Sequence, residues 1–146
     1  MALSENKRAY FDYDILDKYE AGIELLGFEV KSVKSHRINL SGSYVVIRDS
    51  QAWLINADIP PYQPKNTPED YDSKRTRRLL LRRQEINALT GKTKEKGLTL
   101  MPLKAYTKNR KIKIEIGLGR IRKKTDKRDV IKKRNTEKEM RLSKND

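Results

Sequence analysis

The stretch KIKIEIGL, residues 111–118, decides the fold because it carries the clearest pattern in the chain. Its isoleucines and its leucine fall at every second position, with lysine, glutamate or glycine between them. This period of two is typical of a β-strand with one buried face and one face in water. The apolar segment 97–106 precedes it across the turn 107–110, which predicts an antiparallel hairpin in which Pro102 marks an edge or a bulge.

Other short segments carry the same alternation. Residues 11–15 and 19–25 read as two strands, with Asp17-Lys18 as the turn between them. Residues 44–48 and 52–56 read as a second hairpin. Short antiparallel strands without βαβ alternation predict a mainly β fold, a small six-stranded barrel of the oligonucleotide-binding (OB) type with peripheral helices.

Two segments do not follow the strand pattern clearly. The spacing of apolar residues predicts a helix over Arg77–Thr90, with Gly91 in the position of a C-terminal cap. The segment 28–35 fits either a strand or a short helix. Residues 59–68 contain four of the five prolines and are therefore expected to form a loop.

Composition limits the kind of protein. The chain has 146 residues, a formal net charge of +14, no cysteine and one histidine. We therefore expect one domain with a polyanionic partner, nucleic acid first and an anionic membrane surface second. Disulfides, thiolate nucleophiles, Cys/His zinc sites and two-histidine mechanisms are excluded, and no cofactor is expected. Without an apolar leader or a run long enough to span a bilayer, the sequence predicts a soluble cytoplasmic protein.

The charge is divided unevenly along the chain. Residues 120–146 hold twelve basic and five acidic side chains, a net charge of +7, and residues 1–119 hold the other +7. After Ile121 the apolar residues are too few to offset the entropy of ordering the chain. We therefore expect a folded domain over 1–119 and a basic tail over 120–146 that is disordered when free. The acid spacing from Asp126 onward favours a helix on binding, either inside a channel walled by RNA or as a basic arm without such specificity.

A second concentration of positive charge lies within the domain. It consists of Lys74, Arg75, Arg77, Arg78, Arg82 and Arg83. Placed at the start of the predicted helix, these cations face an unfavourable helix dipole unless an anion neutralises them. The cluster is either a contact to RNA phosphates or a solvated helix face.

Aromatic and acidic residues leave alternatives open. Tyr10, Phe11, Tyr13 and Tyr19 either stack on bases or fill the core, whereas Trp53, which alternates with Ile55, is expected in the core. Glu20 and Glu24 would share one strand face. They are ordinary surface acids unless one of them accepts from a guanine edge or a ribose hydroxyl. His36 is expected in a loop or bonded to the backbone.

Several motifs in the same order resemble the SmpB family, whose members partner transfer-messenger RNA in bacterial ribosome rescue. The matching motifs are Asn6-Lys7-Arg8-Ala9, Tyr19-Glu20-Ala21-Gly22-Ile23, Gly27-Phe28-Glu29-Val30-Lys31-Ser32, Ser43-Tyr44, Ile59-Pro60-Pro61-Tyr62, Arg78-Leu79-Leu80-Leu81, Gly91-Lys92, Lys96-Gly97-Leu98-Thr99-Leu100 with Pro102-Leu103, and Asp126-Lys127-Arg128. The resemblance implies an OB-type barrel and a helix over Gly27–Ser35. It also implies that Asn6, Tyr13, Glu20 and the neighbourhood of Leu80 contact the tRNA-like domain of that RNA.

The resemblance further implies a function by molecular mimicry. The folded domain over 1–119, called the body below, would complete a tRNA shape. The complex of the protein with that RNA would be delivered with elongation factor Tu and GTP to a stalled ribosome. The tail would enter the empty mRNA channel near the decoding centre and stand in for codon–anticodon pairing. Its expected contacts are Arg122, Lys123, Lys124, Asp126, Lys127 and Arg128. The protein itself would be a monomer and would catalyse no reaction.

The sequence also departs from the family pattern. Ile121 stands where the family has glycine, and Thr125 stands where it has an aromatic residue or histidine. A histidine-containing loop of many relatives is replaced here by Asp70-Tyr71-Asp72. The alternative function is that of a structural ribosomal or ribosome-assembly protein, and an RNA-cleaving enzyme comes third.

Overall fold

The computed structural model describes residues 2–122. The expectations for the tail, including those for Lys123, Lys124, Asp126, Lys127 and Arg128, lie outside the described residues. The strands are β1 (Ala2–Glu5), β2 (Tyr13–Ile23), β3 (Tyr44–Arg48), β4 (Gln51–Ile55), β5 (Arg77–Leu80), β6 (Leu98–Lys108) and β7 (Lys111–Ile121). The helices are α1 (Lys7–Asp12), α2 (Gly27–Lys34) and α3 (Arg83–Lys92), with a short 3-10 turn, η1 (Pro64–Asn66).

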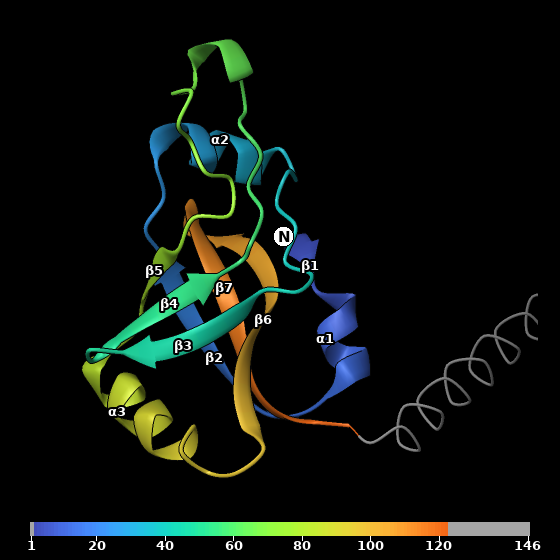
Figure 1. The fold of residues 1–146 in the computed structure, drawn as a ribbon, viewed down its shortest axis with the longest axis vertical. Helices are drawn as coiled ribbons and strands as arrows, with labels where there is room; N and C mark the ends of the chain where they lie inside the picture. Colours follow the sequence, from blue (N-terminus) through green and yellow to red (C-terminus); the bar gives the residue numbers. More distant parts are fainter. Residues whose placement is uncertain (1, 123–146) are drawn as a thin grey trace, which may run out of the picture.

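The strands form one antiparallel sheet that returns on itself. Its order is β1-β6-β3-β4-β5-β2-β7, and β6 also pairs with β7, so six strands form a hydrogen-bonded ring (Figure 1). The prediction of a mainly β, antiparallel, OB-like fold with helices at its periphery is confirmed. The additional strand β1, which pairs with β6 outside this ring, was not predicted.

The two predicted hairpins are present. β6 pairs with β7 from Leu98↔Arg120 to Lys108↔Lys111, and the register shifts between Pro102 and Lys104, where a bulge was expected. On β7 the alternating side chains Ile112, Ile114, Ile116 and Leu118 are buried. Burial of such a side chain contributes roughly 1.5–3 kcal/mol, so this strand anchors the core of the ring.

The segment 13–23 is one continuous strand, so the predicted turn at Asp17-Lys18 is wrong. β2 pairs with β7 along its length, and the register shifts between Ile15 and Asp17. An irregularity of this kind changes which side chains face inward without ending the strand. Phe11 belongs to α1 rather than to a strand, because the side chain of Asn6 caps a helix that begins at Lys7.

The predicted helix over Arg77–Thr90 is wrong in its first part. Residues 77–80 form β5, which pairs with β4 on one side and β2 on the other. α3 begins only at Arg83, where the carboxylate of Glu85 accepts a hydrogen bond from the backbone N–H of Arg82. Gly91 lies inside this helix and is not its cap. The three leucines that follow Arg78 fit either period, and the two neighbouring strands decide between them.

Trp53 is not a core residue. Its neighbours Ala52 and Leu54 are fully buried, whereas Trp53 is half-buried on the outer face of β4. In an uninterrupted apolar run both faces look alike, so the period does not say which face is inside. Its indole Nε1 donates to the carbonyl oxygen of Arg48 across the hairpin.

The helix over Gly27–Ser35 and the proline-rich loop are present. α2 ends at Lys34 and buries Val33 against the ring. The chain between β4 and β5 passes beside α2 and reaches η1 at its tip (Figure 1). His36 follows α2 with a positive φ of 63°, and its Nδ1 lies 3.1 Å from the carbonyl oxygen of Leu3, so it interacts with the backbone as expected.

Gly119 is predicted to be required where β7 meets β2. A Cβ at this position would lie 2.9 Å from the carbonyl oxygen of Asp14, so Gly119→Ala must push two paired backbones apart. We expect urea unfolding to show a loss of about 1–3 kcal/mol in the free energy of unfolding.

The matched control is Gly91→Ala. A Cβ there would have no neighbour within 4 Å, and alanine favours a helix over glycine by about 1 kcal/mol. Equal stability of the Gly119→Ala chain and the parent chain would contradict the close approach.

Candidate nucleic-acid interface

A buried carboxylate organises the basic cluster. Glu29 of α2 is fully buried, and Arg77 Nη2 lies 2.6 Å from its Oε2. Arg75 forms a second ion pair with the same carboxylate, and the backbone N–H of Leu26 donates to it at 2.8 Å. Burial alone would raise the pKa of Glu29, but these hydrogen bonds outweigh it and lower the pKa to about 2. Glu29 is therefore ionised at neutral pH.

Tyr71 completes this network from the connection between β4 and β5, residues 56–76, which is called the projecting loop below. Its hydroxyl lies 2.8 Å from Glu29 Oε2 and 2.8 Å from the carbonyl oxygen of Ile59, and its ring packs edge-on against Phe28. Burial and the bond to Glu29 raise its pKa to about 12, so it stays protonated. The loop whose role the sequence left open is thus fastened to α2 by Tyr71.

Arg77 is consequently not a surface cation. Its side chain is fully buried and also donates to the carbonyl oxygens of Ala57 and Ser73, at 2.8 and 2.9 Å. With its donors directed at internal acceptors, it cannot reach a phosphate in this conformation. The expected phosphate contact at Arg77 is therefore corrected to a structural role.

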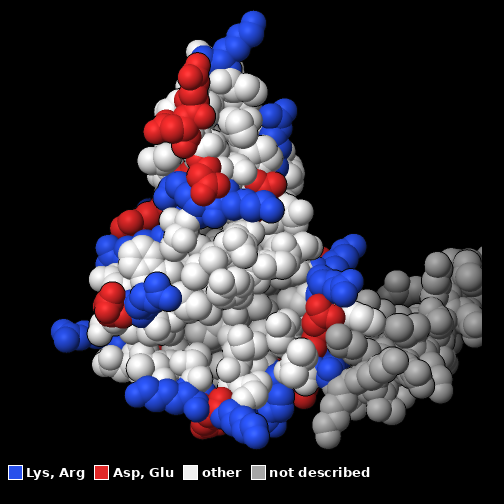
Figure 2. All heavy atoms as spheres, viewed as in Figure 1, with Lys and Arg blue, Asp and Glu red and all other residues white. Residues whose placement is uncertain are grey.

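The rest of the cluster faces outward in several directions. Arg75 keeps about a third of its side chain exposed, and Arg78 pairs with Glu24 at 3.3 Å in a solvent-exposed contact. Lys74, Arg82 and Arg83 are exposed. On the face drawn in Figure 2, Lys and Arg side chains surround a centre of uncharged residues rather than forming one stripe.

The carboxylate of Glu20, on β2, is held in one orientation by two neighbouring side chains. Tyr106 donates to its Oε2 at 2.5 Å, and Lys108 Nζ lies 3.4 Å from its Oε1. The Tyr106 hydrogen bond, opposed by partial desolvation and assisted by Lys108, lowers the pKa of Glu20. Burial and the bond to Glu20 raise the pKa of Tyr106. An exposed, ionised acceptor held in one orientation is suited to a hydroxyl or amino donor of a partner.

Leu80 lies near Glu20 on the neighbouring strand. It pairs with Gly22 and leaves 45% of its surface exposed. A Cβ at Gly22 would lie 3.3 Å from the Leu80 Cβ, so the glycine lets this side chain lie against β2. Glu20 and Leu80 are thus brought together at one end of β2.

Asn6 and Tyr13 lie toward the other end of this strand. Both line a hollow of about 700 Å³ between α1, residues 41–44 and β6. Asn6 is buried, donates to the carbonyl oxygen of Pro102 at 2.9 Å and accepts from the N–H of Ala9. Its amide therefore holds α1 in place and is not presented to a partner, whereas Tyr13 is half-exposed.

The last described residue of the tail is fixed to the body. The backbone N–H of Arg122 donates to the carbonyl oxygen of Asp12 at 2.8 Å, and its Nε donates to that of Tyr13 at 3.2 Å. Among residues 2–122 there is no group of three side chains suited to hold a metal ion. Within the same residues, no helix is long and apolar enough to cross a membrane.

Comparison with known proteins identifies the family. The family model described as SmpB protein matches residues 3–145. The chain belongs to the SmpB family. The SsrA-binding protein of Gloeothece citriformis is 49% identical over 138 residues, covering 94% of this chain and 89% of that protein. The corresponding protein of Thermosynechococcus vestitus is 47% identical over 138 residues, covering 94% and 91%.

A solved structure agrees with this assignment. It is described as "tmRNA-SmpB: a journey to the center of the bacterial ribosome", and one of its chains is similar to this one with 43% identity and a TM-score of 0.68. The match covers 83% of this chain and 85% of that chain. In this SmpB chain the residues singled out by the family resemblance form two groups, Glu20 with Leu80 and Asn6 with Tyr13, joined by β2.

Sequence reasoning missed the central acid of this SmpB chain. Glu29 was noticed only as part of a family motif, and Tyr71 only as a departure from it. The available signal was an acid three residues after Leu26 at the start of a helix, together with closely spaced arginines in a distant segment. Nothing in that spacing says that Arg77 turns inward.

Glu29→Gln is predicted to be strongly destabilising. The change leaves the Arg77 charge buried without a counterion, which costs about 3–5 kcal/mol in urea unfolding at pH 7. Since the pKa of Glu29 falls from 4.5 to about 2 on folding, its contribution of roughly 3 kcal/mol is complete above pH 4.5 and is lost as the pH falls toward 2. The variant should lack this part of the acid-induced loss.

Glu24→Gln serves as the control for this change. Its ion pair with Arg78 is solvent-exposed, and such pairs contribute less than about 1 kcal/mol. Similar unfolding curves for Glu29→Gln and Glu24→Gln would contradict the role given to the buried pair.

Proposed function

We propose that this protein is a non-catalytic RNA-binding adaptor for ribosome rescue. It binds the tRNA-like domain of transfer-messenger RNA and brings that RNA to stalled ribosomes for trans-translation. The observation that carries the proposal is the relation to SsrA-binding proteins, at 44–49% identity over 94% of the chain. The similarity to a chain of a tmRNA–SmpB structure supports the same partner.

The proposed RNA contact of the body centres on Glu20 and Leu80. Glu20 offers an ionised, oriented acceptor beside Lys108, and Leu80 offers an exposed apolar surface two residues further along β2 at its partner Gly22. This pairing of an acid with an apolar side chain suits recognition of ribose hydroxyls or base edges, in addition to phosphate attraction.

The other residues predicted to contact RNA contribute to binding in different ways. Lys74 and Arg78 supply phosphate contacts from the surface, and Arg75 does so with the part of its side chain that is exposed. Tyr13 contacts the RNA directly. Asn6 acts through the position of α1, because its amide is bonded internally.

The tail is proposed to probe the ribosome. Half of the net charge lies in residues 120–146, which suits a segment that enters the mRNA channel near the decoding centre and stands in for codon–anticodon pairing. Arg122, Lys123, Lys124, Asp126, Lys127 and Arg128 are its proposed contacts. The complex is delivered as one protein copy with the RNA, elongation factor Tu and GTP, in the cytoplasm.

Glu20→Ala is predicted to weaken binding to the tRNA-like domain about tenfold, or ~1.4 kcal/mol, although it removes a negative charge from a basic protein. The affinity would be measured by fluorescence anisotropy at fixed salt. Glu24→Ala, which removes the same charge from a nearby exposed position, should leave the affinity unchanged or slightly raised. A rise for both variants would reject Glu20 as a contact.

A chain ending after Arg122 is predicted to keep the affinity of the body for the tRNA-like domain within about threefold. It includes all of β7 and the bonds from Arg122 to residues 12 and 13, so the described fold is retained. Tagging of peptides on stalled ribosomes in a reconstituted translation reaction should be lost. Loss of most of the RNA affinity would contradict the proposal that the body binds the RNA and the tail acts on the ribosome.

A further inference from the structure

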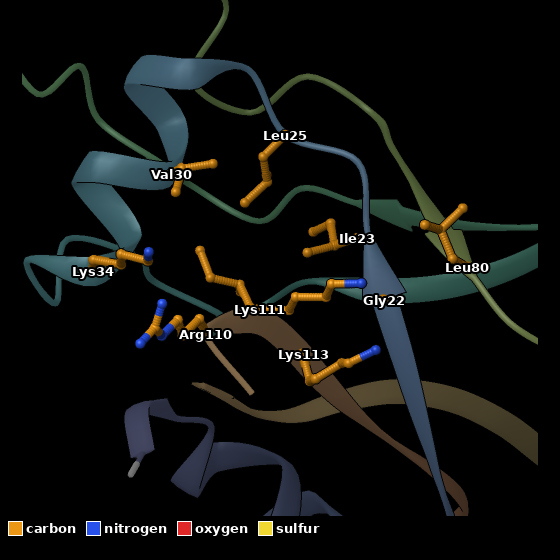
Figure 3. Close-up of a pocket in the computed structure, with 10 residues that line it drawn as sticks. Gly22, Ile23, Leu25, Val30, Lys34, Leu80, Arg110, Lys111 and Lys113 are labelled. Atoms are coloured by element: carbon orange, nitrogen blue, oxygen red, sulfur yellow. The ribbon is translucent and has the colours of Figure 1, made fainter. Parts of the chain in front are cut away.

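A second feature beside Leu80 is a hollow with an apolar floor and a basic rim. It has a volume of about 350 Å³ and lies between α2, the end of β2 and the turn from β6 to β7. Ile23, Leu25 and Val30 point into it, and Gly22 and Leu80 form its side (Figure 3). An open apolar hollow of this size is within the range of small-ligand sites in proteins.

Four cations surround this floor. Lys34 comes from the end of α2, and Arg110, Lys111 and Lys113 come from the β6–β7 turn and β7 (Figure 3). No acid is among the lining residues, and within residues 2–122 none of the four makes an ion pair, although Lys113 is close enough to Glu20 to help lower the pKa of that carboxyl. Like charges held around a low-dielectric floor produce a local positive potential that favours an anionic ligand.

The turn holds part of this rim in a defined place. Asn109 and Arg110 both have positive φ angles, 53° and 66°, as in the two-residue turns that match the twist of an antiparallel hairpin. The turn ties the Arg110 backbone to β7, whose side chain Ile112 is anchored in the core. The hollow is therefore built on regular elements rather than on a loose loop.

The floor distinguishes the ligand from a bare phosphate. A phosphate held by the rim would leave Ile23, Leu25 and Val30 in water, whereas an unstacked nucleobase has a flat apolar face to cover them and phosphates on both sides for the cations. An arginine guanidinium at the edge, such as that of Arg110, can also stack on a base.

We propose that this hollow receives one unstacked nucleobase of the bound RNA, with its flanking phosphates on Lys34, Arg110 and Lys111. The inference rests on the proposed function, because it extends the contact at Leu80 toward α2. It adds α2 and the β6–β7 turn to the RNA-binding surface.

A thiol placed in the hollow tests occupancy, since the chain has no cysteine of its own. Val30→Cys would be alkylated with N-ethylmaleimide, with and without a saturating amount of the tRNA-like domain. We expect the RNA to slow alkylation at least tenfold. Lys31→Cys, on the same helix and outside the lining of the hollow, should be slowed less than twofold. Unchanged alkylation of Val30→Cys with the RNA bound would overturn the proposal.

Two further variants distinguish a base from a phosphate. Alkylating Val30→Cys in advance fills the floor with an uncharged group, so it should weaken RNA binding at least tenfold. Lys34→Ala should reduce the slope of log K against log salt by about one. If the adduct leaves the affinity unchanged while Lys34→Ala reduces the slope, only phosphate binds there and the inserted base is rejected.

Failure of this inference can be separated from failure of the proposed function. If the parent chain binds the tRNA-like domain and the hollow is not protected, the proposed function is retained and the insertion of a base into the hollow is rejected. If the parent chain does not bind that RNA, the proposed function falls and the inference falls with it. Urea unfolding of each variant checks that a lost affinity does not come from a lost fold.

Discussion

The buried ion pair between Glu29 and Arg77 is the constraint on which the rest of the structure depends. Two opposite charges have been removed from water, which is costly unless each is fully bonded. Here the carboxylate accepts from two arginines, a tyrosine and a backbone N–H, and Arg77 also reaches three backbone carbonyls. These bonds join α2, the projecting loop and β5, segments that are far apart in the sequence. The position of α2 over the ring is therefore specified by polar contacts as well as by apolar burial.

The burial of Arg77 removes one cation of the basic cluster from the protein surface. A run of arginines reads as a phosphate-binding cluster in the sequence, but one of its members is the internal partner of an acid. The other members of this cluster stay at the surface, and cations from distant segments join them: Lys34 and Arg110 line the same hollow as Leu80, and Lys108 lies 3.4 Å from Glu20. Net charge predicts a polyanionic class of partner. The place where the partner binds depends on tertiary structure.

The parts of the fold that were predicted from sequence are those in which one period is unambiguous. Residues 111–118 alternate without exception, so the hairpin of β6 and β7 followed directly. Residues 77–81 and 52–55 are apolar or mixed without a clean period, so the helix at Arg77 and the inward Trp53 were wrong. The contacts of Glu29 and Tyr71 depend on partners more than 40 residues away, which local patterns do not encode. The family resemblance supplied Glu20 and Leu80, and the structure places Leu80 opposite Gly22, two residues along β2 from Glu20.

Strand β1 has a consequence for how the protein can be handled. It pairs with β6 opposite Lys104, Ala105 and Tyr106, where β6 extends beyond its short pairing with β3. Without β1, that stretch of backbone would present open N–H and C=O groups on which the edge of another chain could pair. The first few residues thus serve as a built-in cover against self-association. Affinity tags and fusion partners belong ahead of Ala2, where they leave this cover intact.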